Sequence, residues 1–132
     1  MSAKELFEKI RSDGFRLARM EWTYETVVNY AIEANGAPMD SIRVKGGSSN
    51  LIADNVAAFV DLRNAIDQLK NEYKDRVWKG DQLLEKIDNK EAASVIRLHY
   101  IFRLSWENVA DLSHYSVRHV IRISENALKN MS

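Results

Sequence analysis

The sequence predicts an all-α protein: a long, antiparallel, coiled-coil-like helical hairpin followed by a C-terminal three-helix domain that contains a helix-turn-helix. Only one proline and five glycines occur among the 132 residues. Apolar residues recur at intervals of three and four through most of the chain, as on one face of a helix. Charged residues fill the positions between them, which is typical of helices exposed on one side. We therefore expect a self-association hairpin over residues 1–88 and a helix-turn-helix domain over residues 89–132.

Composition and charge limit the classes of protein to which this chain can belong. Hydrophobic residues make up 45% of the sequence, enough for a core, and there is no cysteine. A disulfide framework, a thiolate zinc site and a cysteine nucleophile are therefore excluded. The formal net charge is zero, so any polyanionic partner must be met by a local patch. The start of the chain lacks an apolar signal core and no apolar run approaches the length of a membrane span, so we expect a cytoplasmic protein without membrane contact.

The first predicted helix begins at Ser2 and extends to about Ala34. Ser2 and Glu5 have the spacing of a capping box, in which each side chain satisfies a backbone N–H of the first turn. A glycine and a proline follow the helix, and we interpret residues 39–50 as a linker. The apolar residues that recur with the helical repeat are Leu6, Ile10, Leu17, Met20, Tyr24, Val27 and Ala31.

The second predicted helix begins after Asn50 and carries a coiled-coil-like seam. Its apolar residues are Ile52, Val56, Phe59, Leu62, Ile66, Leu69, Tyr73, Val77, Leu84 and Ile87. Gly80 stands where a further seam residue would fall. Since glycine in a helix interior costs about 1 kcal/mol, Gly80 indicates a bend or a close helix contact.

The length of this second helix predicts self-association. A helix of about 38 residues spans about 57 Å, whereas a compact chain of this size has a radius of gyration of only about 14 Å. The first helix is nearly long enough to lie antiparallel to it, but part of the seam stays exposed. Trp22 and Tyr30 also fall off the main apolar stripe of the first helix and are expected to contact another neighbour. We therefore expect a homo-oligomer that forms through these helices.

A shorter helix is expected between the hairpin and the helix-turn-helix. Asp88 and Glu91 have the spacing of a capping box at its start. His99 is interpreted as a core histidine rather than a ligand, and Trp106 is expected to pack against this helix. The predicted inner face consists of Ala92, Val95, Ile96, His99 and Phe102.

The stretch from Ser105 to Met131 has the pattern of two helices joined by a short turn. Ser105 is a good N-cap for the first helix and Ser116 for the second. Residues 113–115 interrupt the apolar pattern between them. Ala110 is small, as is needed where the second helix crosses the first closely. A short helix, a tight turn and a longer helix are typical of a helix-turn-helix.

The outer face of the second of these helices is basic. Its residues, at intervals of three or four, are Arg118, Arg122, Glu125 and Lys129, with His119 beside them. From residue 115 onward three basic residues stand against one acidic residue, although from residue 88 onward the balance is only six to five. A basic face on the second helix of such a unit is what enters a DNA major groove. An ordinary solvated surface is the alternative interpretation of the same residues.

This part of the chain resembles the C-terminal part of phage and prophage transcriptional regulators of the ArpU/RinA type, which are similar to region 4 of bacterial sigma factors. His114 stands where that family usually has a glycine in the turn, and a left-handed histidine there costs roughly 1 kcal/mol more than glycine. The resemblance rests on the pairs Tyr100-Ile101, Ser105-Trp106, Val109-Ala110, Tyr115-Ser116, His119-Val120 and Ala127-Leu128.

The residues and the resemblance together predict a sequence-specific, DNA-binding transcriptional regulator of phage or prophage origin. The resemblance also implies RNA polymerase as a candidate partner. The residues expected to contact base edges are Arg118, His119 and Arg122. Those expected to contact phosphates are Arg103, Ser105, Ser116 and Lys129.

No catalytic or metal-binding pattern accompanies these residues. The histidines do not share a helix face, and Gly46-Gly47 is not followed by the Lys-Ser or Lys-Thr of a phosphate loop. We therefore predict no enzyme activity, no metal, no cofactor and no small-molecule substrate. Two alternatives remain open. One is a small terminase-like packaging subunit, which also joins a helix-turn-helix to oligomerising helices, and the other is a helix-turn-helix module that binds RNA polymerase or another protein rather than DNA.

Overall fold

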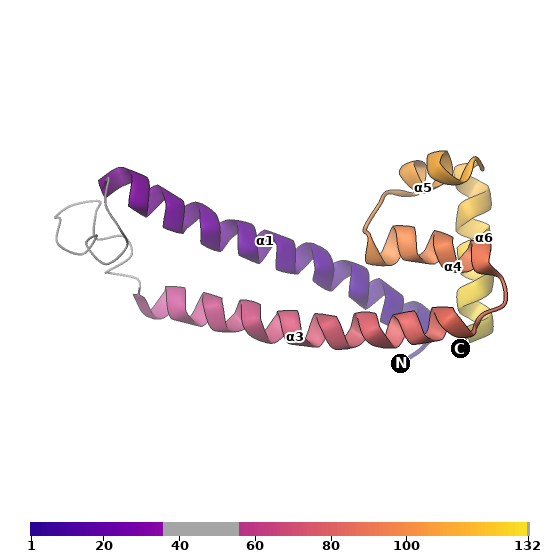
Figure 1. The fold of residues 1–132 in the computed structure, drawn as a ribbon, viewed down its shortest axis with the longest axis horizontal. Helices are drawn as coiled ribbons and strands as arrows, with labels where there is room; N and C mark the ends of the chain where they lie inside the picture. Colours follow the sequence, from indigo (N-terminus) through magenta and orange to yellow (C-terminus); the bar gives the residue numbers. More distant parts are fainter. Residues whose placement is uncertain (36–55, 132) are drawn as a thin grey trace. The chain divides into compact units, whose positions relative to one another are not determined.

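The computed structural model describes residues 1–35 and 56–131 (Figure 1). Its elements are α1 (Ala3–Asn35), α3 (Val56–Lys86), α4 (Lys90–Ile96), the π-helical turn η3 (Arg97–Ile101), α5 (Trp106–Ser113) and α6 (Val117–Met131). The described residues contain no β-strand, so the all-α prediction is confirmed. The predicted linker and the predicted Asn50 cap lie outside the described residues.

The chain forms two compact units, and their boundaries differ from the predicted division at residue 88. The first unit comprises Met1–Phe15 and Asn71–Ser132, and the second comprises Arg16–Lys70. The start of α1 and the end of α3 therefore pack with the C-terminal helices. The physical reason is a shared core, because Phe7 of α1 and Leu84 of α3 belong to the same apolar cluster as residues of α4 and α6.

The core of the first unit is built where α1, α3, α4 and α6 meet. Phe7 and Ile10 of α1 are fully buried, and Leu84 of α3 is almost so. Ile96 of α4 and Leu128 of α6 complete this cluster. Burying such large apolar side chains stabilises a fold by about 1.5–3 kcal/mol each. The C-terminal helices are therefore held to the long helices by ordinary hydrophobic packing.

A buried carboxylate also joins α1 to α3 in the first unit. The side chain of Asp13 is 5% exposed, and Arg76 Nη1 donates to its Oδ2 at 2.6 Å. Lys9 Nζ lies 3.6 Å from the other carboxylate oxygen. A buried charge is tolerated only when it is paired in this way. The pairing also fixes the register in which the two helices meet.

Gly80 allows α3 to approach α1 closely. A Cβ atom at this position would stand 3.0 Å from atoms of both Phe7 and Ile10. Both of those side chains are fully buried. The close helix contact that the sequence suggested at Gly80 is therefore confirmed.

We expect Gly80→Val to lower the free energy of unfolding by about 1–3 kcal/mol, because the added side chain overpacks this contact. Thermal and urea unfolding followed by circular dichroism would measure the loss. Lys79→Val is the matched control, since Lys79 is the exposed neighbour of Gly80 on the same helix. Equal stability of the two variants would contradict the close contact.

The second unit contains the remaining parts of α1 and α3. The ring of Tyr24 packs edge-on against Phe59, with 5.8 Å between the centroids. Trp22 and Tyr30, which the sequence placed off the main stripe, are 67% and 55% exposed. Among the described side chains of this unit, the buried apolar ones are Leu17, Ile66 and Leu69. Few of the described apolar side chains of this unit are therefore buried, and large aromatic ones are exposed.

The cap of α4 is one residue later than the sequence suggested. Asn89 is the N-cap, and its Oδ1 accepts a hydrogen bond from the Ala92 N–H at 3.1 Å. The predicted capping box of Asp88 and Glu91 is therefore wrong. An asparagine is as good an N-cap as an aspartate, so the sequence pattern alone did not separate the two positions.

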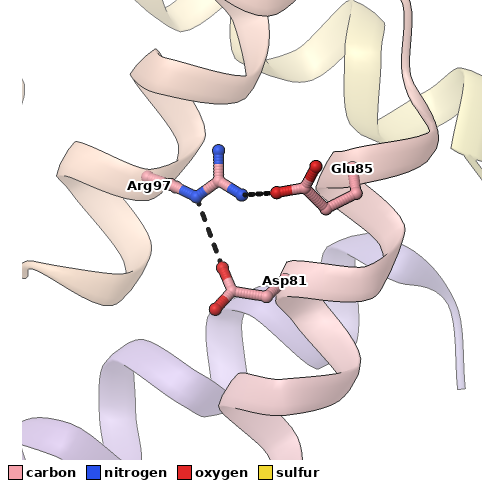
Figure 2. A network of polar contacts seen from close by, with 3 residues as sticks. All are labelled: Asp81, Glu85 and Arg97. Atoms are coloured by element: carbon pink, nitrogen blue, oxygen red, sulfur yellow. Dashed lines mark hydrogen bonds and ion pairs between the residues drawn. The ribbon is translucent and has the colours of Figure 1, made fainter.

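Arg97 ties the start of η3 to α3. Its Nε lies 3.3 Å from Asp81 Oδ1, and its Nη2 lies 3.3 Å from Glu85 Oε1 (Figure 2). The two carboxylates are one helical turn apart on α3, so a single guanidinium spans both. Both carboxylates are largely solvated, so each contact contributes little energy. The pair of contacts joins η3 to α3.

The π-helical turn changes which residues face the core. The Phe102 N–H donates to the Arg97 carbonyl at 2.9 Å, a five-residue step instead of four. His99 and Tyr100 are both buried, whereas Phe102 is 64% exposed. The prediction that Phe102 lies on the inner face is therefore wrong. The wider turn holds an extra residue, which moves the apolar face away from the position that a regular α-helix would give.

His99 is confirmed as a core histidine. Its Nδ1 lies 2.8 Å from the carbonyl oxygen of Leu104, and its ring stacks on Trp106 with 3.6 Å between the centroids. Burial lowers the pKa of His99, and the nearby Arg11 guanidinium lowers it further. The ring is therefore neutral near pH 7, and it donates from Nδ1 because a carbonyl oxygen can only accept. The expected packing of Trp106 against this segment is confirmed as well.

Candidate nucleic-acid interface

One face of α6 is buried against α4 and α5, which both lie beside it (Figure 1). Val120, Ser124 and Leu128 are at most 1% exposed. Val120 packs with Val109 and Ala110 of α5 in a second apolar cluster. Ala110 is therefore buried where α5 meets α6, as its small size predicted. The opposite face of α6 is left to solvent.

Serine caps begin both α5 and α6, and a left-handed residue ends α5. Ser105 Oγ accepts from the Asn108 N–H at 3.2 Å, and Ser116 Oγ accepts from the His119 N–H at 3.1 Å. Both predicted N-caps are therefore confirmed. His114 has φ 61° and ψ 34°, the conformation that the sequence suggested for the turn.

Arg118, Arg122 and Lys129 lie on the free face of α6 with their side chains exposed. None of the three has an ion pair or a hydrogen bond to any residue that the structure describes. Arg118 and Arg122 are one turn apart, so their guanidinium groups can reach the same ligand. His119 directly follows Arg118 in the sequence, near the start of the helix, and it is half-buried. The three predicted base-contacting residues therefore come from two adjacent turns of one helix.

Tyr115 holds His119 in place. Its ring meets the imidazole edge-on, with 4.6 Å between the centroids. Its hydroxyl donates to Glu91 Oε2 at 2.6 Å, which joins the turn to the start of α4. This hydrogen bond raises the pKa of Tyr115 above its ordinary value. Sequence reasoning used Tyr115 only as a turn residue, because nothing in the spacing of positions 91 and 115 signals their contact.

Arg103, a predicted phosphate contact, lies elsewhere. Its φ of 62° turns the chain after η3, and its side chain packs over Gly14 of α1. Its Nη1 donates to the Tyr73 hydroxyl at 3.3 Å, and its guanidinium lies 5.7 Å from the centroid of Phe15. The structure thus places Arg103 against the long helices and does not bring it together with the free face of α6.

The other residues predicted to contact phosphates, Ser105, Ser116 and Lys129, are at least partly exposed. Ser116 is exposed and Ser105 is half-buried, and both use the hydroxyl oxygen as a cap acceptor. A hydroxyl that accepts a cap bond still carries a hydrogen that can be donated to a phosphate. Lys129 lies in the last turn of α6, 11 residues after Arg118. At 1.5 Å per residue this corresponds to about 16 Å along the helix.

The described residues hold no group of three histidines, cysteines or acidic residues that could bind a metal ion. No helix among them is long and apolar enough to cross a membrane. Comparison of the chain with protein-family models, with curated proteins and with solved structures gave no match.

Removal of the Tyr115 hydroxyl should have a pH-dependent effect on stability. A raised pKa in the folded state means that the bond to Glu91 stabilises the fold below the ordinary tyrosine pKa of about 10. The stabilisation is lost as the pH rises through the raised value, because a phenolate cannot donate. We expect the melting temperature of Tyr115→Phe to lie below that of the wild type at pH 7, and the difference to shrink above pH 10. Circular dichroism measures both, and a difference that grows with pH would contradict the assignment.

Proposed function

We propose that the chain is a sequence-specific, double-stranded DNA-binding regulator, in which α5 and α6 form a helix-turn-helix and α6 is the recognition helix. The observation that supports this most is the pair of exposed, unpaired arginines on α6, Arg118 and Arg122. They stand opposite the buried face of Val120, Ser124 and Leu128. An amphipathic helix of this kind presents its cations outward without loss of packing.

The dimensions of α6 suit a major groove. The helix has 15 residues, which corresponds to about 22 Å at 1.5 Å per residue. The major groove of B-DNA is about 12 Å wide and admits an α-helix. We assign Arg118 and Arg122 to guanine O6 and N7, which a guanidinium contacts through two parallel hydrogen bonds. His119, held by Tyr115, is assigned to the intervening base edge.

Phosphate contacts would fix the orientation of the helix on the duplex. We assign these contacts to the hydroxyls of Ser105 and Ser116 and to the ammonium group of Lys129. Arg103 is left out, because its side chain is engaged with Tyr73 and Phe15. The resemblance to ArpU/RinA-type regulators and to sigma factor region 4 supports the same arrangement, and with it a phage or prophage setting and contact with RNA polymerase.

Alanine at Arg118 or at Arg122 should cost about 1–3 kcal/mol on a specific site and relax the base preference there. The site would first be selected from random duplex oligonucleotides with the wild-type chain. Gel-shift titration at fixed salt then compares the variants. Lys74→Ala is the matched control, since Lys74 is exposed on α3 and its substitution also removes one positive charge. Wild-type affinity in the Arg118/Arg122 double variant would remove α6 from the interface.

A protein-binding module is the second candidate function, and the outer face of α5 favours it. Leu112 is 60% exposed there, and the neighbouring Glu107 and Asp111 are acidic. An acidic, apolar surface is repelled by DNA and suits a protein such as RNA polymerase. The two functions differ in salt dependence, because only DNA binding releases condensed counterions and weakens steeply as salt rises.

We further propose that α1 and α3 form the antiparallel hairpin that the sequence predicts and that the second unit joins copies of the chain. The exposed apolar side chains Trp22, Tyr30 and Val60 support this, since each is more than half exposed. A homodimer would place two recognition helices on a symmetric DNA site.

Sedimentation should show a dimer or larger species at roughly tens of micromolar protein, and Trp22→Glu combined with Val60→Glu should give a monomer, because a buried unpaired charge is costly. Trp78→Glu is the matched control, since Trp78 is 65% exposed, close to the 67% of Trp22, but lies in the first unit. A monomeric wild-type chain would reject the proposal. Equal effects of the Trp22/Val60 double variant and of Trp78→Glu on the oligomeric state would reject it as well.

A further inference from the structure

We propose that the first unit binds a small zwitterionic molecule with an aromatic ring, of the chemical class of the aromatic α-amino acids. The site is a hollow between the start of α1, η3, α5 and α6, with a volume of about 440 Å³. Ligand sites for small molecules have volumes of this order. The proposal goes beyond DNA binding and does not depend on it.

Arg11 supplies a positive charge that the protein does not neutralise. Its Nη1 donates to the backbone carbonyls of His99 and Leu104. Within the described part of the chain no carboxylate is paired with it. Burial lowers the pKa of Arg11, and repulsion from Arg103 lowers it further. An anionic group in the hollow would relieve this uncompensated charge.

Glu8 supplies a negative charge on the same face of α1. It is exposed and lines the hollow three residues before Arg11 and four after Lys4, a spacing at which helix side chains are neighbours. Nevertheless Glu8 is in no ion pair with a described residue, because Lys4 is engaged by Glu125 at 3.0 Å. One unpaired cation and one unpaired anion therefore stand a helical turn apart at one site.

Aromatic side chains line the hollow beside these charges, together with Lys4, Ser12 and Glu125. Trp106 is half-buried and stacked on His99, and it meets Tyr100 edge-on with 6.1 Å between the centroids. On the other side Phe15 is 39% exposed and lies 4.9 Å below the Arg11 guanidinium. A planar ring bound here would cover apolar surface that is otherwise wet, and aromatic pairs add to such burial.

The charges decide between classes of ligand. A simple anion such as phosphate would meet Arg11 but would be repelled by Glu8. A simple amine would meet Glu8 but would be repelled by Arg11. A zwitterion carries both charges on neighbouring atoms, so its carboxylate can accept from Arg11 while its ammonium donates to Glu8. Charge-assisted hydrogen bonds of this kind are stronger than neutral ones.

The test uses L-tryptophan, indole-3-propionate and tryptamine as probes for the full chain without DNA. Indole-3-propionate lacks the ammonium group and tryptamine lacks the carboxylate. We expect L-tryptophan to bind saturably with a Kd of about 100 μM, as suits a ligand of its size. Each analogue should bind at least about tenfold more weakly, since each loses one charge-assisted contact. Titration calorimetry measures the affinity of each probe. The amide NMR shifts of the residues that line the hollow show where the probe binds.

Glu8→Gln should weaken L-tryptophan binding about tenfold, because the ammonium contact is lost. It should not weaken the binding of indole-3-propionate, which has no ammonium group and is repelled by the Glu8 carboxylate. The substitution is on an exposed position, so the fold is retained, which circular dichroism checks. Glu25→Gln is the matched control, since Glu25 is also exposed on α1 but lies in the second unit. The proposal is overturned if L-tryptophan does not saturate the chain, if the three probes bind alike, or if Glu8→Gln binds as the wild type does. Because no DNA is present, failure here leaves the proposed DNA function untouched.

Discussion

The burial of one face of α6 determines what its other face can do. Val120, Ser124 and Leu128 are almost completely buried in the first unit. A helix of 15 residues is marginal by itself in water, so its stability comes from this packing. The cations Arg118 and Arg122 take no part in it, and they are therefore free to bind a partner without cost to the fold.

The same packing joins α6 to the start of the chain. Leu128 of α6 shares a cluster with Phe7 of α1 and Leu84 of α3, and Glu125 of α6 pairs with Lys4. The start of α1 and the end of α3 therefore form part of the unit that carries α6. Loss of the close contact at Gly80 would loosen that unit as a whole. The hollow beside Arg11 lies in the same unit, where Glu125 is one of its walls.

Periodicity and capping residues were enough to predict the helices and the candidate surface. Ser105 and Ser116 cap α5 and α6 as expected, and the basic residues of α6 lie on its exposed face, because both signals are local in the sequence. The π-helical turn was not predicted in this way, and it lies where Arg11 of α1, distant in the sequence, donates to the carbonyls of His99 and Leu104. For the same reason the exposure of Phe102, the position of the Arg103 side chain and the bond between Tyr115 and Glu91 escaped prediction. Each depends on residues that are distant in the sequence.

We propose that the free face of α6 lies in the major groove of DNA, and cleavage of the DNA from defined positions on the chain tests this directly. The chain contains no cysteine, so a single one can carry a chelated iron that cleaves nearby DNA. Asn126→Cys places it on the exposed side of α6, and Ser94→Cys places it on an exposed position of α4. If α6 lies in the groove, iron at position 126 should cleave the selected duplex at a few adjacent nucleotides within the site. Iron at position 94 should cleave it more weakly. Strong cleavage from position 94 with none from position 126 would contradict it.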